Sequence, residues 1–125
     1  MVNKQEERDK VLKPCLKLCQ GLKYSGAILQ YRRLDVFDKT HIEGSPDIEI
    51  FLPKDGLVWI LMCECKKPIG GVFSKAQIEY KEKYSKFKNV VYAGVTDVKQ
   101  LNELVCSMSG YMDDKIQEMN EWKIN

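Results

Sequence analysis

The chain has 125 residues, 44% of them hydrophobic, which is typical of one globular domain with a single core. No apolar run is long enough for a membrane span and the polar N-terminus lacks a signal-peptide pattern, so we expect an intracellular, cytoplasmic protein. Twenty basic and 18 acidic side chains leave a net charge of +2, with the excess of base in residues 1–96, which is compatible with polyanion binding but also with simple solvated lysines.

Five cysteines are present, and an odd number without a signal peptide argues against a disulfide framework. Cys15 and Cys19 share a helix face, and Cys63 and Cys65 share a strand face, so neither pair has the usual spacing of a zinc knuckle on a turn. We interpret them as buried, reduced thiols that act as small apolar side chains, with a zinc site as the alternative. The fifth cysteine is Cys106.

Residues 4–20 are predicted to form the first helix, because apolar side chains recur at helical spacing from Val11 to Cys19. Pro14 should kink this helix or begin a second piece, and Gly21 is expected to end it. A strand over 27–34 and a long polar loop over 35–45 follow.

Residues 47–52 and 57–66 are predicted to form a hairpin around the turn "PKDG" at 53–56. Ser74 is expected to cap a helix that runs to about Phe87. A strand over 89–95 and a helix over 96–108 complete the order α-β-β-β-α-β-α, and residues 111–122 are expected to add a last helix. The unit 57–95 should be a parallel, right-handed crossover, so the fold class is α/β, a mixed β-sheet flanked by helices.

Charged side chains stand at the end of the apolar strand 57–66. Because side chains alternate between the faces of a strand, Glu64 and Lys66 point away from Cys63 and Cys65. The hairpin brings Asp47 opposite Glu64, and two adjacent carboxylates repel unless a positive group lies between them. A divalent cation with oxygen ligands suits that position, and Mg²⁺ typically uses one or two protein carboxylates.

These residues resemble a known nuclease pattern. "GSPDIEIFL" followed by "ECKKPIGG" resembles the PD-(D/E)xK signature, and the later "SKAQ" makes the segment 41–96 similar to the VRR-NUC branch of that superfamily. The branch includes small phage proteins that resemble Holliday junction resolvases. The resemblance implies a single VRR-NUC-like domain over 1–125, with a restriction-endonuclease-like core at about 4–108, and it is consistent with a phage or prophage origin.

The resemblance also implies roles for individual residues. Asp47, Glu64 and the backbone carbonyl of Cys65 would bind Mg²⁺, for which Mn²⁺ would substitute, and Lys66 would be the catalytic lysine. Gln77 would line the site, and Glu7 would supply the acid of the first helix, with Glu6 as the rival. Nucleic acid would be bound by a set of basic side chains: Arg32, Arg33, Lys67 and Lys75.

Several of these residues have simpler interpretations. Glu64 and Lys66 are also compatible with a structural ion pair, and Gln77 with a capping box around Ser74, although this does not exclude a place in the site. Glu49 is expected to be exposed rather than part of the site, and His41 to lie at the surface. The remaining group is expected to pack rather than to stack on bases: Tyr24, Tyr31, Tyr80 and Tyr84.

The expected function is therefore a metal-dependent, structure-selective DNA endonuclease that cuts branched DNA such as four-way junctions. A non-catalytic DNA-binding module, a nuclease subunit of a larger assembly and a sequence-specific restriction-type enzyme are the alternatives. A homodimer is expected from the resemblance, with residues 97–122 as its surface, unless they only cover the sheet. The apolar side chains of that segment are Leu101, Leu104, Val105, Met108, Met112, Ile116 and Met119.

Overall fold

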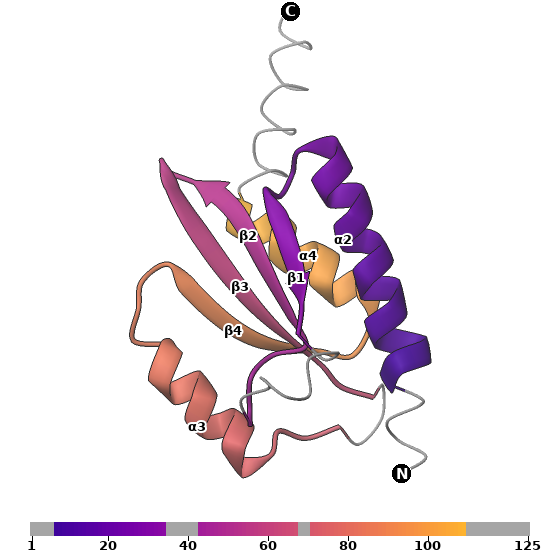
Figure 1. Ribbon diagram of the computed structural model, residues 1–125, viewed down its shortest axis with the longest axis vertical. Coiled ribbons are helices and arrows are strands. Elements are labelled where there is room, and N and C mark those ends of the chain that lie inside the picture. Colours follow the sequence, from indigo (N-terminus) through magenta and orange to yellow (C-terminus); the bar gives the residue numbers. More distant parts are fainter. Residues whose placement is uncertain (1–6, 35–42, 68–70, 110–125) are drawn as a thin grey trace, which may run out of the picture.

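The computed structural model describes residues 7–34, 43–67 and 71–109 and shows one four-stranded sheet in the order β1-β2-β3-β4 (Figure 1). β1 and β2 are antiparallel, as are β2 and β3, whereas β3 and β4 are parallel. The predicted α/β class, mixed sheet and element order are confirmed. The elements are η1 (Arg8–Leu12), α2 (Lys13–Ser25), β1 (Gln30–Arg33), β2 (Ile48–Lys54), β3 (Leu57–Cys65), α3 (Lys75–Tyr84), β4 (Val90–Val95) and α4 (Val98–Ser109).

The first helix has two parts that join at Pro14. One wide π-helical turn, η1, precedes α2, and Pro14 occupies the first turn of α2, where its missing N–H costs little. The predicted break near Pro14 is therefore confirmed. The predicted stop at Gly21 is wrong: α2 continues to Ser25 and ends at Gly26, whose φ of 85° allows a left-handed C-cap.

The β2–β3 hairpin turns more tightly than the sequence predicts. Lys54 pairs with Leu57, so the connection is only Asp55 and Gly56, with positive φ values of 53° and 73°. An Asp-Gly pair favours this two-residue turn, which matches the twist of the strands. Pro53 belongs to β2, which tolerates it because β1 pairs only as far as Phe51 and leaves that edge open.

Two other predicted boundaries also differ from those observed. α3 stops at Tyr84 rather than near Phe87, and the segment before β4 is a turn. β1 is shorter than the predicted strand 27–34, because Ala27 N–H and Ile28 N–H both donate to Leu22 O and hold this segment against the end of α2. Predictions for His41 and the helix 111–122 concern residues outside the described part.

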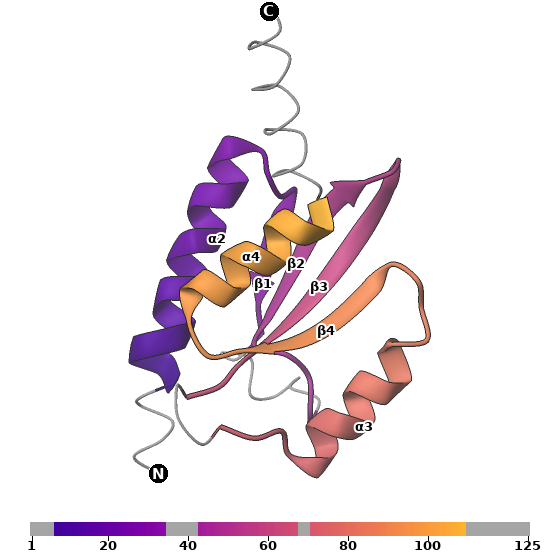
Figure 2. The same ribbon diagram turned by 180° about the vertical axis from the view of Figure 1, so that it is seen from behind.

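Helices α2 and α4 lie side by side on one face of the sheet (Figure 2). The core fills the layer between them, with Ile48, Ile50, Leu52 and Leu61 fully buried on the sheet side. The apolar stripe of α4 belongs to this core, since its buried side chains are Leu101, Val105 and Met108. Covering the sheet accounts for that stripe, and the dimer surface expected there stays a prediction for residues beyond 109.

Four of the cysteines meet in this core. Cys15 and Cys19 from α2 and Cys63 and Cys65 from β3 are all at most 1% exposed, and all are free thiols. Burial raises the pKa of Cys19 to about 12, so this thiol stays protonated at neutral pH. Among the described residues no group of three or more His, Cys, Asp or Glu side chains is arranged to hold a metal ion. Cys15, Cys19, Cys63 and Cys65 pack with the aliphatic side chains of the core, as small apolar residues do.

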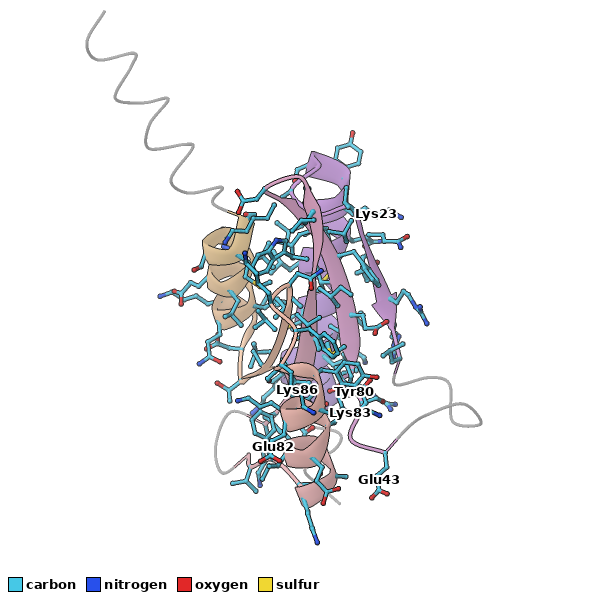
Figure 3. All side chains as sticks on the ribbon, turned by 90° about the vertical axis from the view of Figure 1, so that its left-hand side faces the viewer. Lys23, Glu43, Tyr80, Glu82, Lys83 and Lys86 are labelled. Atoms are coloured by element: carbon cyan, nitrogen blue, oxygen red, sulfur yellow. The ribbon has the colours of Figure 1, made fainter. Side chains whose placement is uncertain are left out.

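The opposite face of the sheet carries α3 and an aromatic cluster. Tyr80 of α3 stacks on Tyr84 at 4.6 Å between ring centroids and meets Tyr92 of β4 at 5.9 Å. Figure 3 shows Tyr80 on the side of α3 next to the sheet and Lys83 and Lys86 at its surface. The prediction of packing roles fits Tyr80, Tyr84 and Tyr31, but it is wrong for Tyr24, which is 96% exposed.

No helix within the described ranges is long and apolar enough to cross a membrane.

The buried thiols allow a simple chemical check of this packing. In the folded protein a thiol reagent should modify Cys106, which is only partly buried, while Cys15, Cys19, Cys63 and Cys65 react at least tenfold more slowly because they are inaccessible and protonated. Ellman's reagent and mass spectrometry would measure this, with all five cysteines reacting in denaturant as the control. Equal rates for all five in native buffer would contradict the packing.

Candidate active site

The loop that precedes Asp47 is held rigidly against α3 and β4. Gly44 has a φ of 86°, and a Cβ at this position would collide with the Ala76 carbonyl group in the first turn of α3. The Gly44 carbonyl oxygen accepts a 3.0 Å hydrogen bond from the buried Tyr92 hydroxyl. Only glycine combines this backbone conformation with so close an approach. Ser45 and Pro46 are buried behind it, so the chain enters β2 along a defined path.

Asp47 is fixed by both its backbone and its carboxylate. Its N–H donates to Cys63 O at 3.0 Å, and its carbonyl oxygen accepts from Leu34 N–H at 2.8 Å. The carboxylate oxygen Oδ2 accepts a 2.8 Å hydrogen bond from the Cys65 backbone N–H. In an extended strand the N–H and C=O of one residue point to the same side, so the Cys65 carbonyl oxygen also faces Asp47.

Glu64 is a buried carboxylate, and one of its oxygens has no hydrogen-bond partner within the described residues. Its side chain is on the α3 face of β3, the residue is 6% exposed, and the oxygen without a partner is Oε2. Burial and the adjacent Asp47 carboxylate raise the pKa of Glu64 to about 9, against a smaller opposing effect of Lys66. Since the charge of Asp47 is one of the main causes of this rise, the two carboxyl groups lie close together, consistent with the predicted cross-strand pairing.

Lys66 is held by Gln77 rather than by Glu64. Its ammonium nitrogen donates to Gln77 Oε1 at 2.7 Å. The same oxygen accepts from Ser74 N–H at 2.8 Å, and Gln77 N–H donates to Ser74 Oγ at 3.2 Å, which completes a capping box. Both interpretations of Gln77 therefore hold at once: it caps α3 and it binds the lysine. The simple Glu64–Lys66 ion pair is not what this geometry shows.

An aromatic ring covers the neighbouring position on β4. Gly94 pairs with Glu64 across the parallel strands, and a Cβ there would lie 2.7 Å from the Phe73 ring. The Lys66 ammonium nitrogen lies 5.6 Å from the centroid of this ring, within cation–π range. Phe73 thus shields one side of the lysine from water, and glycine at position 94 gives the ring its place.

Glu7 is the described acid nearest to this pair along the first helix. It lies directly before η1, which contacts β3, and its charge adds to the rise in the pKa of Glu64. π-helical turns are rare and occur frequently at functional sites. Glu6, the alternative, is outside the described residues.

The basic residues expected to bind nucleic acid occupy different surroundings. Arg32 is exposed and pairs with Glu49 at 3.7 Å, so Glu49 is a half-buried partner of an arginine rather than an exposed acid. Lys67 follows Lys66 just beyond the end of β3, and Lys75 is exposed at the start of α3. Arg33 points to the other face of the sheet, beside α2.

The oxygen atoms present are suited to a hard divalent cation. Glu64 is buried, Asp47 beside it is partly buried, and the Oε2 atom of Glu64 has no hydrogen-bond partner among the described residues. Strand geometry turns the Cys65 carbonyl oxygen to the same side. A cation bound by Asp47 and Glu64 would supply the missing positive charge, and oxygen ligands of this kind favour Mg²⁺ or Mn²⁺ over soft metals.

Comparison of the chain with protein-family models, with curated proteins and with solved structures finds no significant match.

Two contributors to this site were missed by the sequence reasoning. Tyr92 holds Gly44, and Phe73 packs on Gly94, yet both aromatics stand in ordinary strand or loop patterns. The sequence contains a signal only for the contact between Phe73 and Gly94, because a glycine inside a strand often marks a position where another residue packs closely against the backbone. Nothing in the local sequence connects Tyr92 with a residue 48 positions away.

Gly44 and Gly56, two of the three positive-φ glycines among the described residues, form a matched pair for testing the loop. Gly44→Ala should lower the free energy of unfolding by roughly 3 kcal/mol, because it adds a backbone collision to left-handed strain. Gly56→Ala should cost only about 1 kcal/mol, since nothing lies within 4 Å of its Cβ position. Urea unfolding would measure both, and equal losses would contradict the tight packing of Gly44 on α3.

Glu64 gives the fold a defined pH dependence in the absence of metal. Its folded-state pKa of about 9 lies above its ordinary value of 4.5. The contribution of Glu64 to the free energy of unfolding is therefore greatest at low pH and is lost as the pH rises towards 9. Glu64→Gln should therefore raise the free energy of unfolding by roughly 2–4 kcal/mol near pH 8 and flatten the dependence on pH.

Denaturant titrations between about pH 5 and 9 in EDTA would measure this effect. Glu82→Gln, on the exposed side of α3, is the matched control and should leave the pH dependence as it is. If the Glu64→Gln protein is no more stable than the wild type near pH 8, the Glu64 carboxyl group does not have the raised pKa that its burial implies.

Proposed function

We propose that this protein is a metal-dependent DNA endonuclease with a restriction-endonuclease-like core. One observation carries the proposal: the buried Glu64 carboxyl group lies beside the partly buried Asp47, and Lys66, two residues after Glu64, is held next to them by Gln77. The resemblance of "GSPD", "ECK" and "SKAQ" to the VRR-NUC pattern supports the same assignment, since these three segments meet in space.

The arrangement is costly for a purely structural site. A buried carboxyl oxygen without a partner lowers stability, and an apolar side chain of similar size would avoid that cost. The lysine offsets only a smaller part of this cost, because its ammonium group is hydrogen-bonded to Gln77 rather than to Glu64. Unfavourable placement of titratable groups with strongly shifted pKa values is typical of functional sites.

Mg²⁺ or Mn²⁺ held by Asp47 and Glu64, with the Cys65 carbonyl oxygen, would supply Lewis-acid activation of the scissile phosphate and of water. The residues of the chain do the remaining work. Gln77 Oε1 aims the Lys66 ammonium group, which stabilises the negative charge that develops on the phosphate oxygens. Phe73 keeps water from one side of that group, and Glu7 provides a further acid at the edge.

In the proposed reaction, a water oxygen forms a bond to phosphorus as the bond from phosphorus to the 3′ oxygen breaks. The departing oxygen takes up a proton, which leaves a 3′-hydroxyl and a 5′-phosphate end. We further propose that branched DNA, such as a four-way junction, is the substrate, and that a homodimer places two such sites around it. Binding would depend mainly on phosphates and would weaken with salt.

The decisive measurement is cleavage of labelled DNA. Wild-type protein should cut a four-way junction in the presence of Mg²⁺ and should be inactive in EDTA. Asp47→Ala and Lys66→Ala should each lower the rate by at least about a hundredfold, because they remove a metal ligand and a charge-stabilising group. Undiminished cleavage by either variant, or cleavage that survives EDTA, would overturn the assignment.

Ser74→Ala and Gln77→Ala separate the capping role from the catalytic one. Both lose a cap interaction of α3, but only Gln77→Ala also releases Lys66. Gln77→Ala should therefore lower the rate at least tenfold more than Ser74→Ala at equal stability. DNA binding by the wild type without any cleavage in Mg²⁺ or Mn²⁺ would favour a non-catalytic module instead.

A further inference from the structure

A second basic feature lies on the other side of the sheet edge, away from the carboxylates. An open groove of about 450 Å³ runs between α2 and the edge strand β1. Four of its residues recur at helical spacing on one face of α2, and two alternate on β1. Its lining consists of Lys13, Leu16, Lys17, Gln20, Tyr31 and Arg33.

The lining of the groove is unusually basic and polar for a helix face that adjoins a sheet. Three of the six side chains are cationic, none is acidic, and the polar ends of Gln20 and Tyr31 add hydrogen-bonding capacity. Lys13 has one acidic neighbour outside the groove, Asp9, at 3.1 Å, but both side chains are about half exposed or more, so this pair is weak. Leu16 and Tyr31 pack against the core and form a firm, partly apolar floor.

The groove begins close to the carboxylate site but faces another direction. Arg33 immediately precedes Leu34, whose N–H binds the backbone of Asp47. On β1, however, Arg32 pairs with Glu49 on the carboxylate face, so Arg33 and Tyr31 must point to the α2 face. A DNA strand at the carboxylates would have to pass round the edge of β1 to reach the groove.

We propose that this groove binds the phosphate backbone of a second DNA segment, an arm other than the one that is cut. Clustered Lys and Arg side chains are the usual ligands of backbone phosphates, and a volume of about 450 Å³ accommodates a nucleotide unit with its sugar on the Leu16–Tyr31 floor. A straight duplex held at the carboxylates would lie on one face of the sheet only. A branched DNA has a second arm, whose phosphate backbone would reach the groove on the other face. The inference rests on the proposed nuclease function and identifies branched DNA as its substrate.

The test compares binding by two charge-matched double variants. Lys17→Gln with Arg33→Gln removes two cations from the groove, and Lys23→Gln with Lys99→Gln removes two exposed cations elsewhere. Dissociation constants would be measured by fluorescence anisotropy in EDTA over a series of salt concentrations, for a four-way junction and for a linear duplex. Circular dichroism would confirm that each variant is folded.

For the junction, the groove variant should bind on the order of tenfold more weakly than the control, and its salt slope should fall by about 2, because each of the two removed cations no longer neutralises a phosphate. For the duplex the two variants should be alike. If loss of Arg33 impairs folding, Gln20→Glu, which places a carboxylate in the groove, should weaken junction binding alone.

The outcomes separate this inference from the nuclease proposal. A wild-type protein that cuts the junction, together with a groove variant that matches the control in affinity and salt slope, overturns the groove and leaves the nuclease intact. Equal weakening for junction and duplex overturns the second-arm assignment. A wild-type protein that binds the junction but does not cut it in Mg²⁺ or Mn²⁺ overturns the nuclease, whatever the groove variants do.

Discussion

The buried carboxyl group of Glu64 is the constraint around which this end of the molecule is built. It stands beside Asp47 with one oxygen that no donor of the described segments reaches, and burial together with that neighbour favours its protonated form. The fold tolerates this energetic cost because several separate interactions hold the surrounding backbone in place. The Cys65 N–H holds the Asp47 carboxylate, and the tight Gly44 loop holds the start of β2.

At this end of β3 the sheet separates an apolar face from a charged face. On one face the alternation of β3 directs Cys63 and Cys65 into a core of protonated thiols and aliphatic side chains. On the other face the same strand presents Glu64, and Lys66 follows it. A one-residue slip of register would exchange the two faces, so the hairpin turn at Asp55 and Gly56 also determines where the charges stand.

Most of the architecture was predictable, because local patterns and the global fold agree. Period-two alternation, the capping residue Ser74 and the Asp-Gly turn each indicate the element that is observed. The errors occurred where a local signal was weaker than packing. Gly21 is a plausible stop, yet α2 continues through it, because the core contacts of the helix outweigh the modest cost of one glycine.

By itself, the sequence determined which residues carry charge at the strand ends and which faces they share, because alternation and hairpin pairing are local properties. Only the tertiary structure decided what those charges do to one another. It showed that Lys66 binds Gln77 rather than Glu64, that Tyr92 secures Gly44, and that Arg33 shares a groove with α2. Burial and the partners contributed by distant segments set these interactions, and neither is encoded in the spacing of neighbouring residues.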